Sequence, residues 1–296
     1  MTQVQGKVAV VTGGGSGIGA GLAKELARRG ARVAVTDILV DNARDVAARI
    51  AADGGGAIAL HCDVCDRGSI AAMKAEANAR LGPVQLLFAN AGATSFTELA
   101  AMSDDDVDWI IEVNLKGVMN TTRAFLPDMI AAREGHIVAT ASMAGLLPGW
   151  IPAHAPYSAA KLGIIGLMMN LALELREHNV FTTSYCPGAV ASGMKANNNR
   201  YRPSRFGGPS EEGWVRFSGT STIHSDLPFY HPDSIAPMVL QAVLDNRPLV
   251  FDHAEQRRLF RETYANIVEA CFDDIDAWER EHGIPDPNPT GAELLS

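Results

Sequence analysis

The sequence predicts an α/β fold, a doubly wound parallel β-sheet with helices on both faces, formed as a single domain. From residue 7 to about residue 190, short β-branched runs alternate with longer helical stretches. The short runs are apolar on both faces, which is typical of strands in a parallel sheet that helices cover on either side. The crossovers between such strands are expected to be right-handed.

The elements follow in a regular order. Strands are expected at 7–11, 32–36, 57–63, 86–90, 136–141 and 181–186, with helices at about 17–29, 41–53, 67–81, 103–133 and 156–178. A further helix at about 232–245 precedes a last short strand at 249–252. No linker, repeat or low-complexity stretch divides the chain. Residues 1–253 are therefore expected to form one domain.

Two segments depart from this alternation. Residues 189–231 are rich in Gly, Pro, Ser and Asn, and so long a loop in a compact domain indicates either a functional lid or disorder. We interpret it as a substrate lid. Residues 254–296 are expected to form a C-terminal helical extension packed on the same domain, with a helical tail to about 282 and Pro285, Pro287 and Pro289 closing it off.

Composition excludes several classes of function. The chain has 296 residues, of which 47% are hydrophobic and 20% charged, enough apolar material for a substantial core. Its net charge is −9, from 25 basic and 34 acidic residues, which argues against a nucleic-acid groove or an anionic membrane surface as partner. Apolar stretches end before they could span a bilayer, and residues 1–7 lack the core of a signal peptide. We expect a cytoplasmic protein.

The pair Cys62-x-x-Cys65 raises the question of a metal or redox site. Zinc requires two further ligands at suitable spacing, and none follows. The pair also lies in and just after a strand-like run, where cysteine usually behaves as a small buried apolar residue. We expect no metal.

A glycine-rich turn, Thr12–Gly19, connects the first strand to the first helix. Glycines let the backbone turn sharply and approach a pyrophosphate without a Cβ in the way. The helix N-terminus that follows offers free N–H groups and the positive end of the helix dipole. In the first βα unit of a doubly wound sheet, this turn predicts a dinucleotide site.

Asp37 ends the second strand, 18 residues after Gly19. A carboxylate there accepts hydrogen bonds from the adenosine ribose and would repel a 2′-phosphate. No Arg or Lys stands in the glycine turn or directly after Asp37 to receive such a phosphate. NAD is therefore expected in preference to NADP. The alternative is that Asp37 only caps the next helix.

Tyr157 and Lys161 lie four residues apart on an expected helix and therefore share a face. A free phenol, with a pKa of about 10, is a poor base near neutral pH. A nearby ammonium, together with the positive nicotinamide of NAD⁺, favours the phenolate and lowers that pKa. Ser142 follows the preceding strand, at the sheet edge where ligands gather. The three residues predict a site for proton transfer.

These residues together resemble the single-domain branch of the short-chain dehydrogenase/reductase family. The matching pieces occur in the family's order over about residues 5–192, and the last strand and its helix fit too. Such a chain is expected to have the Rossmann fold. The pieces are Thr12–Gly19, Asp37, Asp63-Val64, Asn90-Ala91-Gly92, Asn114, Ser142, Tyr157-x-x-x-Lys161 and Pro187-Gly188.

The resemblance implies a role for each catalytic residue. Tyr157 would be the general acid/base, and Lys161 would lower its pKa and bind the nicotinamide ribose. Ser142 would orient the substrate oxygen, and Asn114 would hold a water that links Lys161 to solvent.

The resemblance also implies a set of cofactor-binding residues. Asp63 would contact the adenine amine, Asn90 and Gly92 would line the cofactor and fix the central strand, and Val190 and Ser192 would meet the carboxamide. The full expected set is Gly13, Gly15, Ser16, Gly17, Ile18, Gly19, Asp37, Asp63, Val64, Asn90, Ala91, Gly92, Tyr157, Lys161, Pro187, Gly188, Val190 and Ser192.

One spacing departs from the family pattern. Ser142 and Tyr157 are 15 residues apart, roughly two more than is commonest in the family. The extra length lies in the loop 147–154. If this loop bulges outward, Ser142 keeps its role; otherwise Thr140 is the alternative hydroxyl. Within the loop we expect His154 to be exposed, and Trp150 and Ile151 to line a pocket.

The helix after Lys161 is apolar nearly all round from Leu162 to Met169 and must be buried. Members of the resembled family use this helix to form dimers and tetramers, so we expect a homodimer or homotetramer. The alternative is burial within one chain under the C-terminal tail.

The run from Asn197 to Phe206 in the lid, and the helical tail, are similar to a subgroup that oxidises the benzylic alcohol of lignin-derived aryl ethers. We therefore expect an NAD-dependent oxidoreductase that reversibly interconverts a small-molecule secondary alcohol and its ketone, with a bulky hydrophobic or aromatic substrate. Steroid or acyl carbonyl reduction by the same family is an alternative. A non-catalytic dinucleotide-binding sensor is another, which the complete set of catalytic residues disfavours.

Overall fold

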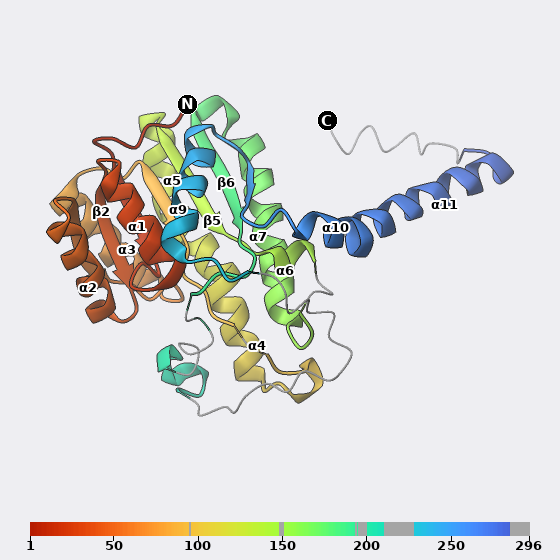
Figure 1. Cartoon of the computed structure of the whole chain (residues 1–296), viewed down its shortest axis with the longest axis horizontal. Helices are drawn as coiled ribbons and strands as arrows, with labels where there is room; N and C mark the ends of the chain where they lie inside the picture. The colour runs from red at the N-terminus through yellow and green to blue at the C-terminus, as the bar shows by residue number, and fades with distance from the viewer. Residues whose placement is uncertain (95, 148–150, 193, 195–199, 210–227, 285–296) are drawn as a thin grey trace. The chain divides into compact units, whose positions relative to one another are not determined.

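The protein is described by a computed structural model covering residues 1–94, 96–147, 151–192, 194, 200–209 and 228–284. In this part of the chain, seven parallel strands form one sheet in the order β3-β2-β1-β4-β5-β6-β7 (Figure 1). The predicted doubly wound parallel fold is confirmed. The strands are β1 (Val8–Thr12), β2 (Arg32–Asp37), β3 (Gly56–His61), β4 (Leu86–Ala89), β5 (Gly135–Thr140), β6 (Val180–Cys186) and β7 (Leu249–Phe251).

Helices connect the strands and pack in two layers. One layer holds α1, which packs against α2 and α9; elsewhere α3 packs against α5, and α4 against α7. The helices are α1 (Gly17–Arg28), α2 (Val40–Ala52), α3 (Arg67–Leu81), α4 (Asp104–Ile111), α5 (Gly117–Ala132), α6 (Met143–Leu146), α7 (Ala155–Glu174) and α9 (Pro232–Leu244). Short 3₁₀ turns lie at η1 (Leu99–Ala101), η3 (Arg176–His178) and η4 (Ser204–Phe206).

The strand order reverses between β1 and β4. The chain runs outward from β1 through β2 to β3, then returns to place β4 on the other side of β1. In a doubly wound sheet, the crevice at this reversal, beyond the carboxyl ends of the strands, is where ligands bind. The glycine turn follows β1, and the segment Asn90–Gly92 follows β4. Both therefore border the crevice.

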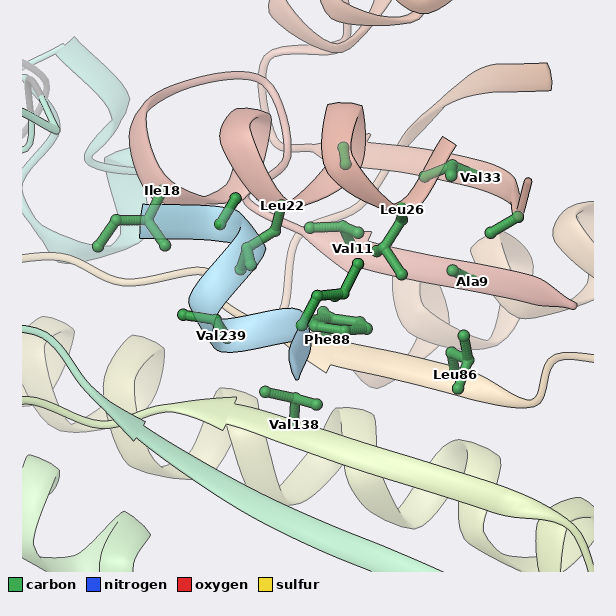
Figure 2. Close-up of a cluster of buried hydrophobic side chains, with 14 of the residues drawn as sticks. Ala9, Val11, Ile18, Leu22, Leu26, Val33, Leu86, Phe88, Val138 and Val239 are labelled. Atoms are coloured by element: carbon green, nitrogen blue, oxygen red, sulfur yellow. The ribbon is translucent and has the colours of Figure 1, made fainter. Parts of the chain in front are cut away.

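The core fixes α1 against the middle of the sheet. Leu22 and Leu26 of α1 are almost completely buried and belong to the same apolar cluster as Val11, Phe88 and Val138 of the sheet (Figure 2). Burial of each such side chain stabilises the fold by about 1.5–3 kcal/mol. This packing holds the N-terminus of α1 at the carboxyl end of β1.

The predicted helix 103–133 contains an irregularity that the sequence did not reveal. Ser103 and Asp106 form a reciprocal capping box at the start of α4, and the chain passes through a π-helical turn, η2 (Glu112–Lys116), before α5. Asn114 lies in this turn. Single π-helical turns of this kind occur frequently at functional sites.

The chain divides into two compact units, Met1–Ala254 and Glu255–Ser296. The second unit contains α10 (Gln256–Phe260), a π-helical turn, η5 (Arg261–Ala265), and α11 (Asn266–His282). The helical tail predicted from 254 to 282 is therefore present, and its packing on the domain stays a prediction. Within the described residues, no helix has the length and apolar character needed to cross a membrane.

Candidate active site

The glycine turn packs directly on the segment that follows β4. Gly13 has a positive φ of 61°, and a Cβ built on it would stand 2.8 Å from Ala91 Cα. A Cβ on Gly19 would stand 2.2 Å from the Gly13 carbonyl oxygen. Only glycine fits at these two positions, because any side chain would push the turn away from its neighbour. The turn consequently leaves the N-terminus of α1 open to the crevice.

Asp37 is connected to both the turn and the next helix. Its carboxylate accepts hydrogen bonds from the N–H groups of Gly15 and Leu39, each at 3.0 Å. Leu39 is the N-cap residue of α2, so this bond reaches the residue before the helix and not an N–H of its first turn. The carboxylate also lines the crevice, as a ribose-binding residue must. Burial raises the pKa of Asp37, and the backbone N–H groups oppose that shift.

Asn90 ties the ends of three strands together. Its Nδ2 donates to the carbonyl oxygens of Thr12 and Gly13, at 3.1 and 3.3 Å. Its Oδ1 accepts a hydrogen bond from the Thr140 hydroxyl at 3.0 Å. The Thr140 hydroxyl is thus engaged at the centre of the sheet, which leaves Ser142 as the hydroxyl near Tyr157.

Tyr157, Lys161 and Ser142 come together despite the unusual spacing. Ser142 is the N-cap of α6, and its Oγ accepts the Ala144 N–H at 3.0 Å. A side-chain hydrogen bond also joins Ser142 to the Tyr157 hydroxyl. Lys161 Nζ lies 5.3 Å from the centroid of the Tyr157 ring and donates to the Thr140 carbonyl at 2.8 Å. The longer segment therefore does not separate Ser142 from Tyr157.

Burial dominates the electrostatics of this pair. It raises the pKa of Tyr157 to about 12, while the Ser142 hydrogen bond acts to lower it. It lowers the pKa of Lys161 to about 7. We predicted a lowered pKa for Tyr157 from Lys161 and the nicotinamide together; the protein's own groups shift it upward. A phenolate near neutral pH thus requires further positive charge beside Tyr157.

Asn114 lies beside Lys161, across Gly92. A Cβ on Gly92 would stand 3.1 Å from Asn114 Oδ1 and 3.6 Å from Lys161 Nζ. The Asn114 amide donates to the carbonyl oxygens of Ala93 and Ile110, each at 2.8 Å, and accepts from the Ala93 N–H. The π-helical turn therefore brings a fully buried amide against the segment after β4.

A cleft of about 1040 Å³, partly open to solvent, joins the glycine turn to Tyr157 and Lys161. Besides Tyr157 and Lys161, the predicted residues that line it are Gly13, Ser16, Gly17, Ile18, Asp37, Asp63, Val64, Asn90, Ala91, Gly92, Pro187 and Ser192. Gly15, Gly19, Asn114, Ser142, Gly188 and Val190 are not among the residues that line it. Its lining runs from the glycine turn to Tyr157 and Lys161, the span that an extended ligand such as a dinucleotide would follow.

The sequence analysis missed several residues that line the same cleft. Trp109 lies five residues before Asn114 and Val113 immediately precedes it, and with Met194 from the lid they form an apolar wall. The apolar spacing Trp109, Ile110, Val113 was the signal that could have placed this wall beside Asn114. Tyr201 and Pro203 from the lid also line the cleft, and no local pattern indicates their position.

A buried network supports the turn Pro187-Gly188 and was also missed. Asp252, just after β7, accepts hydrogen bonds from the Gly188 N–H at 2.7 Å and from the Tyr185 hydroxyl at 2.6 Å. Nδ1 of the neighbouring His253 lies 2.6 Å from Asp252 Oδ1, the oxygen that also accepts the Gly188 N–H, and its Nε2 lies 2.9 Å from the Pro228 carbonyl oxygen. These bonds hold the two ends of the lid segment at the carboxyl edge of the sheet.

The lid begins and ends side by side. Val190 and Tyr230 form a parallel bridge, with the Ala191 N–H donating to the Tyr230 carbonyl at 3.0 Å. Of the two residues predicted to meet the carboxamide, Val190 pairs with Tyr230 in this bridge and Ser192 lines the cleft. The predicted segment Asn197–Asn199 lies outside the described residues.

The expectation that His154 is exposed was wrong. The side chain is 4% exposed, and its ring stacks on Phe96 and lies tilted against Tyr157, at centroid distances of 4.8 and 4.2 Å. Because His154 immediately precedes α7, the ring is carried into the site with Tyr157. Trp150 lies outside the described residues. Ile151 is half-buried and is not among the residues that line the cleft.

Cys62 and Cys65 are free thiols at the edge of the cleft. Burial raises the pKa of both to about 12, which disfavours the thiolate that a metal requires. Within the described residues, no three His, Cys, Asp or Glu side chains are grouped so as to hold a metal ion.

One face of α7 is buried and the other is not. Ile164, Ile165 and Met168 pack inside the domain, whereas Leu162 and Met169 are 41% and 51% exposed. Leu173, further along this face, is also exposed. The helix was predicted to be buried all round. Within the chain only the face with Ile164, Ile165 and Met168 is buried.

Comparison with known proteins agrees with this architecture. A family model described as short chain dehydrogenase matches residues 7–203. A C alpha-dehydrogenase of Sphingobium sp. strain SYK-6 is 31% identical over 276 residues, covering 91% of this chain and 88% of that protein. The similarity to this subgroup, predicted from the lid and the tail, is therefore confirmed at the level of sequence.

Solved structures share the fold. A short-chain dehydrogenase/reductase of Burkholderia phymatum in complex with NAD has a TM-score of 0.77 and 28% identity, covering 88% of this chain and 94% of that one. A short-chain oxidoreductase from a metagenome in complex with NADP has a TM-score of 0.65 and 33% identity, covering 84% and 96%. Family match, sequence similarity and fold agree: this chain belongs to the short-chain dehydrogenase family.

Proposed function

We propose that this oxidoreductase uses NAD to interconvert a secondary alcohol and its ketone, with Tyr157 as the general acid/base. The observation that carries the proposal is that Tyr157 and Lys161 line the same cleft as the glycine turn and Asp37. One end of the cleft thus offers backbone N–H groups and a ribose acceptor, and the other offers a proton acceptor. An extended dinucleotide matches that arrangement.

The residues of the cleft fit a dinucleotide in chemical terms. The glycines leave space for a pyrophosphate at the N-terminus of α1, and Asp37 offers a carboxylate to the adenosine ribose. Lys161 would bind the nicotinamide ribose. When bound, the oxidised nicotinamide accepts the hydride from the carbinol carbon and adds positive charge beside Tyr157.

Tyr157 and Ser142 act on the substrate oxygen. Ser142 orients that oxygen by a hydrogen bond, and the Tyr157 phenolate removes its proton as the hydride leaves. In the reverse direction, Tyr157 protonates the developing alkoxide. Lys161, held by the Thr140 carbonyl, keeps positive charge next to the phenol, and Asn114, on the other side of Gly92, would hold a water that links Lys161 to solvent.

Asp37 supports the choice of NAD over NADP. Its carboxylate is fixed by two backbone N–H groups and would repel a 2′-phosphate. Proteins of the same fold bind either dinucleotide, as the two solved structures above illustrate. The charge at this one position is therefore the feature that favours NAD.

The walls of the cleft support a bulky hydrophobic or aromatic substrate. Trp109, Val113 and Met194 present apolar surface next to Tyr157, and Phe96 extends this surface through His154. Apolar walls with few polar groups favour hydrophobic ligands. The named C alpha-dehydrogenase relative points in the same direction.

The exposed face of α7 supports a homodimer or homotetramer. Leu162, Met169 and Leu173 lie at helical spacing and leave a continuous apolar strip on the chain. A second copy that packs along this strip would remove it from water. The cytoplasmic location stays a prediction from the sequence.

A substrate panel tests the function. NADH formation is followed across secondary alcohols from small aliphatic to bulky aryl compounds, with NADP in parallel. We expect turnover with NAD and a preference for bulky aryl alcohols. A preference for small polar alcohols contradicts the substrate class, and binding of NAD without turnover of any alcohol or ketone indicates the non-catalytic alternative.

A further inference from the structure

A short segment of the lid, Tyr201–Phe206, reaches the end of the cleft where Asp37 lies. The Tyr201 hydroxyl accepts a hydrogen bond from Asn42 Nδ2 at 3.1 Å. Asn42 belongs to α2, and its Cβ would stand 2.7 Å from a Cβ built on Gly15, the residue that donates to Asp37. Tyr201 and Pro203 line the same cleft as Asp37. The segment thus closes one side of this end.

A second contact joins the segment to the stretch that follows β3. Arg205 donates to Asp63 Oδ2 at 2.7 Å, and the other oxygen of Asp63 accepts the Cys65 N–H at 2.9 Å. The Asp63 side chain is 14% exposed, so its bond to the guanidinium is only partly screened by water. Both oxygens of this carboxylate are therefore fixed in direction.

The segment is anchored independently at its middle. Arg202 forms an ion pair with Asp106 of α4 in which both side chains are largely buried, and it also donates to the Phe206 carbonyl. Its guanidinium lies 5.5 Å from the centre of the Trp109 ring. These contacts hold the segment on α4, so Tyr201 and Arg205 are presented to the cleft from a fixed support.

We propose that Tyr201–Phe206 is an adenosine cap, a second set of cofactor-binding residues supplied by the lid, with Tyr201 and Pro203 covering the adenine ring and Arg205 orienting Asp63 toward its amino group. The inference rests on the proposed function, because it assigns residues to the same dinucleotide site. The tyrosine ring and the proline ring offer the flat apolar surface on which a purine stacks. The bond from Arg205 aligns the Asp63 carboxylate as an acceptor.

The cap predicts that the lid contributes to binding of the adenosine half of the dinucleotide and not of the nicotinamide half. The probes are ADP-ribose, which carries the adenosine, the pyrophosphate and the second ribose but no nicotinamide, and nicotinamide mononucleotide, which lacks the adenosine. Binding is measured by calorimetry on the full chain for the wild type, Tyr201→Leu, Arg205→Gln and Arg205→Lys. Arg200→Gln removes an exposed arginine just outside the cap and serves as the matched control.

We expect Tyr201→Leu and Arg205→Gln each to weaken ADP-ribose binding about tenfold, the loss of roughly one charge-assisted or stacking contact. Arg205→Lys should recover part of the affinity, and Arg200→Gln should bind ADP-ribose as the wild type does. Nicotinamide mononucleotide should bind all five proteins alike. Thermal unfolding confirms that each variant is folded.

Three results would overturn the cap. If ADP-ribose binds the Tyr201 and Arg205 variants as tightly as the wild type, the segment does not contact adenosine, and the proposed function is unaffected. If both probes lose affinity equally, the segment acts on the cleft as a whole. A wild type that binds neither ADP-ribose nor NAD removes the proposed function, and the cap with it.

Discussion

Lys161 Nζ lies 5.3 Å from the centre of the Tyr157 ring, one helical turn away, and both side chains are buried. Burial favours the neutral form of each, raising the pKa of Tyr157 to about 12 and lowering that of Lys161 to about 7. A buried cation stabilises a neighbouring phenolate, and a phenolate stabilises a neighbouring ammonium. The two groups are therefore expected to titrate as a coupled pair. Positive charge from the nicotinamide favours the phenolate form of Tyr157.

Replacing Lys161 should remove the cation that the Tyr157 phenolate needs. We expect Lys161→Met to lower the rate of alcohol oxidation at least about 100-fold near neutral pH and to move the remaining activity to higher pH. The pH profile of kcat/KM from pH 6 to 10 measures both effects. Lys116→Met, which removes an exposed lysine of the π-helical turn, is the control. A Lys161 variant with the wild-type profile would show that the ammonium does not act on Tyr157.

Asp37 should determine the preference between the two dinucleotides. Asp37→Ser removes the charge that repels a 2′-phosphate, so the ratio of kcat/KM for NAD to that for NADP should fall by about 10-fold or more. Both ratios are obtained from initial rates with the same alcohol. Asp41→Ser, in the first turn of α2 and exposed, should leave the ratio unchanged. Equal ratios for the wild type and Asp37→Ser contradict the assignment.

The fold and part of the site could be predicted from the sequence because their signals are local. Strand and helix periods, the glycine turn and the four-residue spacing of Tyr157 and Lys161 each depend on neighbouring residues only. The π-helical turn around Asn114 was not predicted, because it differs from an α-helix only by a shift of one residue in its backbone hydrogen bonds.

Contacts between distant segments could not be predicted in this way. Arg205 and Asp63 are 142 positions apart, and Asp252 and Gly188 are 64 apart. No periodicity relates such pairs, and they meet only once the sheet and the lid are folded. The prediction that His154 is exposed was wrong for the same reason. A histidine in a proline-rich loop is expected to be exposed, and its contacts with Phe96 and Tyr157 form only in the folded chain.

His136 should make the fold sensitive to acid. Its ring is fully buried between the hydroxyls of Thr2 and Thr183, each at 2.8 Å, and burial lowers its pKa to about 3. Below about pH 6.5 the unfolded chain binds a proton at His136 that the folded chain does not, so stability falls as pH falls. This one group should reduce the free energy of unfolding by up to about 1.4 kcal/mol per pH unit.

Urea unfolding at pH 7, 6 and 5 measures this contribution. His136→Asn should show a shallower loss of stability between pH 6 and 5 than the wild type, although it is less stable at pH 7. His61→Asn, which replaces an exposed histidine of β3, should follow the wild type. The same pH slope in all three proteins would mean that His136 does not remain neutral in the folded state.

The exposed strip on α7 should hold the oligomer together. Met169→Glu places a charge in the middle of the strip, where burial against a second copy would be unfavourable, so the variant should be monomeric. Light scattering coupled to size exclusion gives the mass of each species. Met238→Glu alters a methionine of α9 that is 40% exposed and should not change the assembly. A wild type that is monomeric at all concentrations contradicts the predicted oligomer.

Proton transfer by Tyr157 is the central claim, and Tyr157→Phe tests it most directly because the substitution removes only the hydroxyl. Single-turnover formation of NADH from a saturating alcohol is measured beside calorimetric binding of NAD to the same protein. We expect turnover to fall at least about 1000-fold while NAD binds nearly as tightly as to the wild type. Turnover at the wild-type rate in Tyr157→Phe would contradict the account.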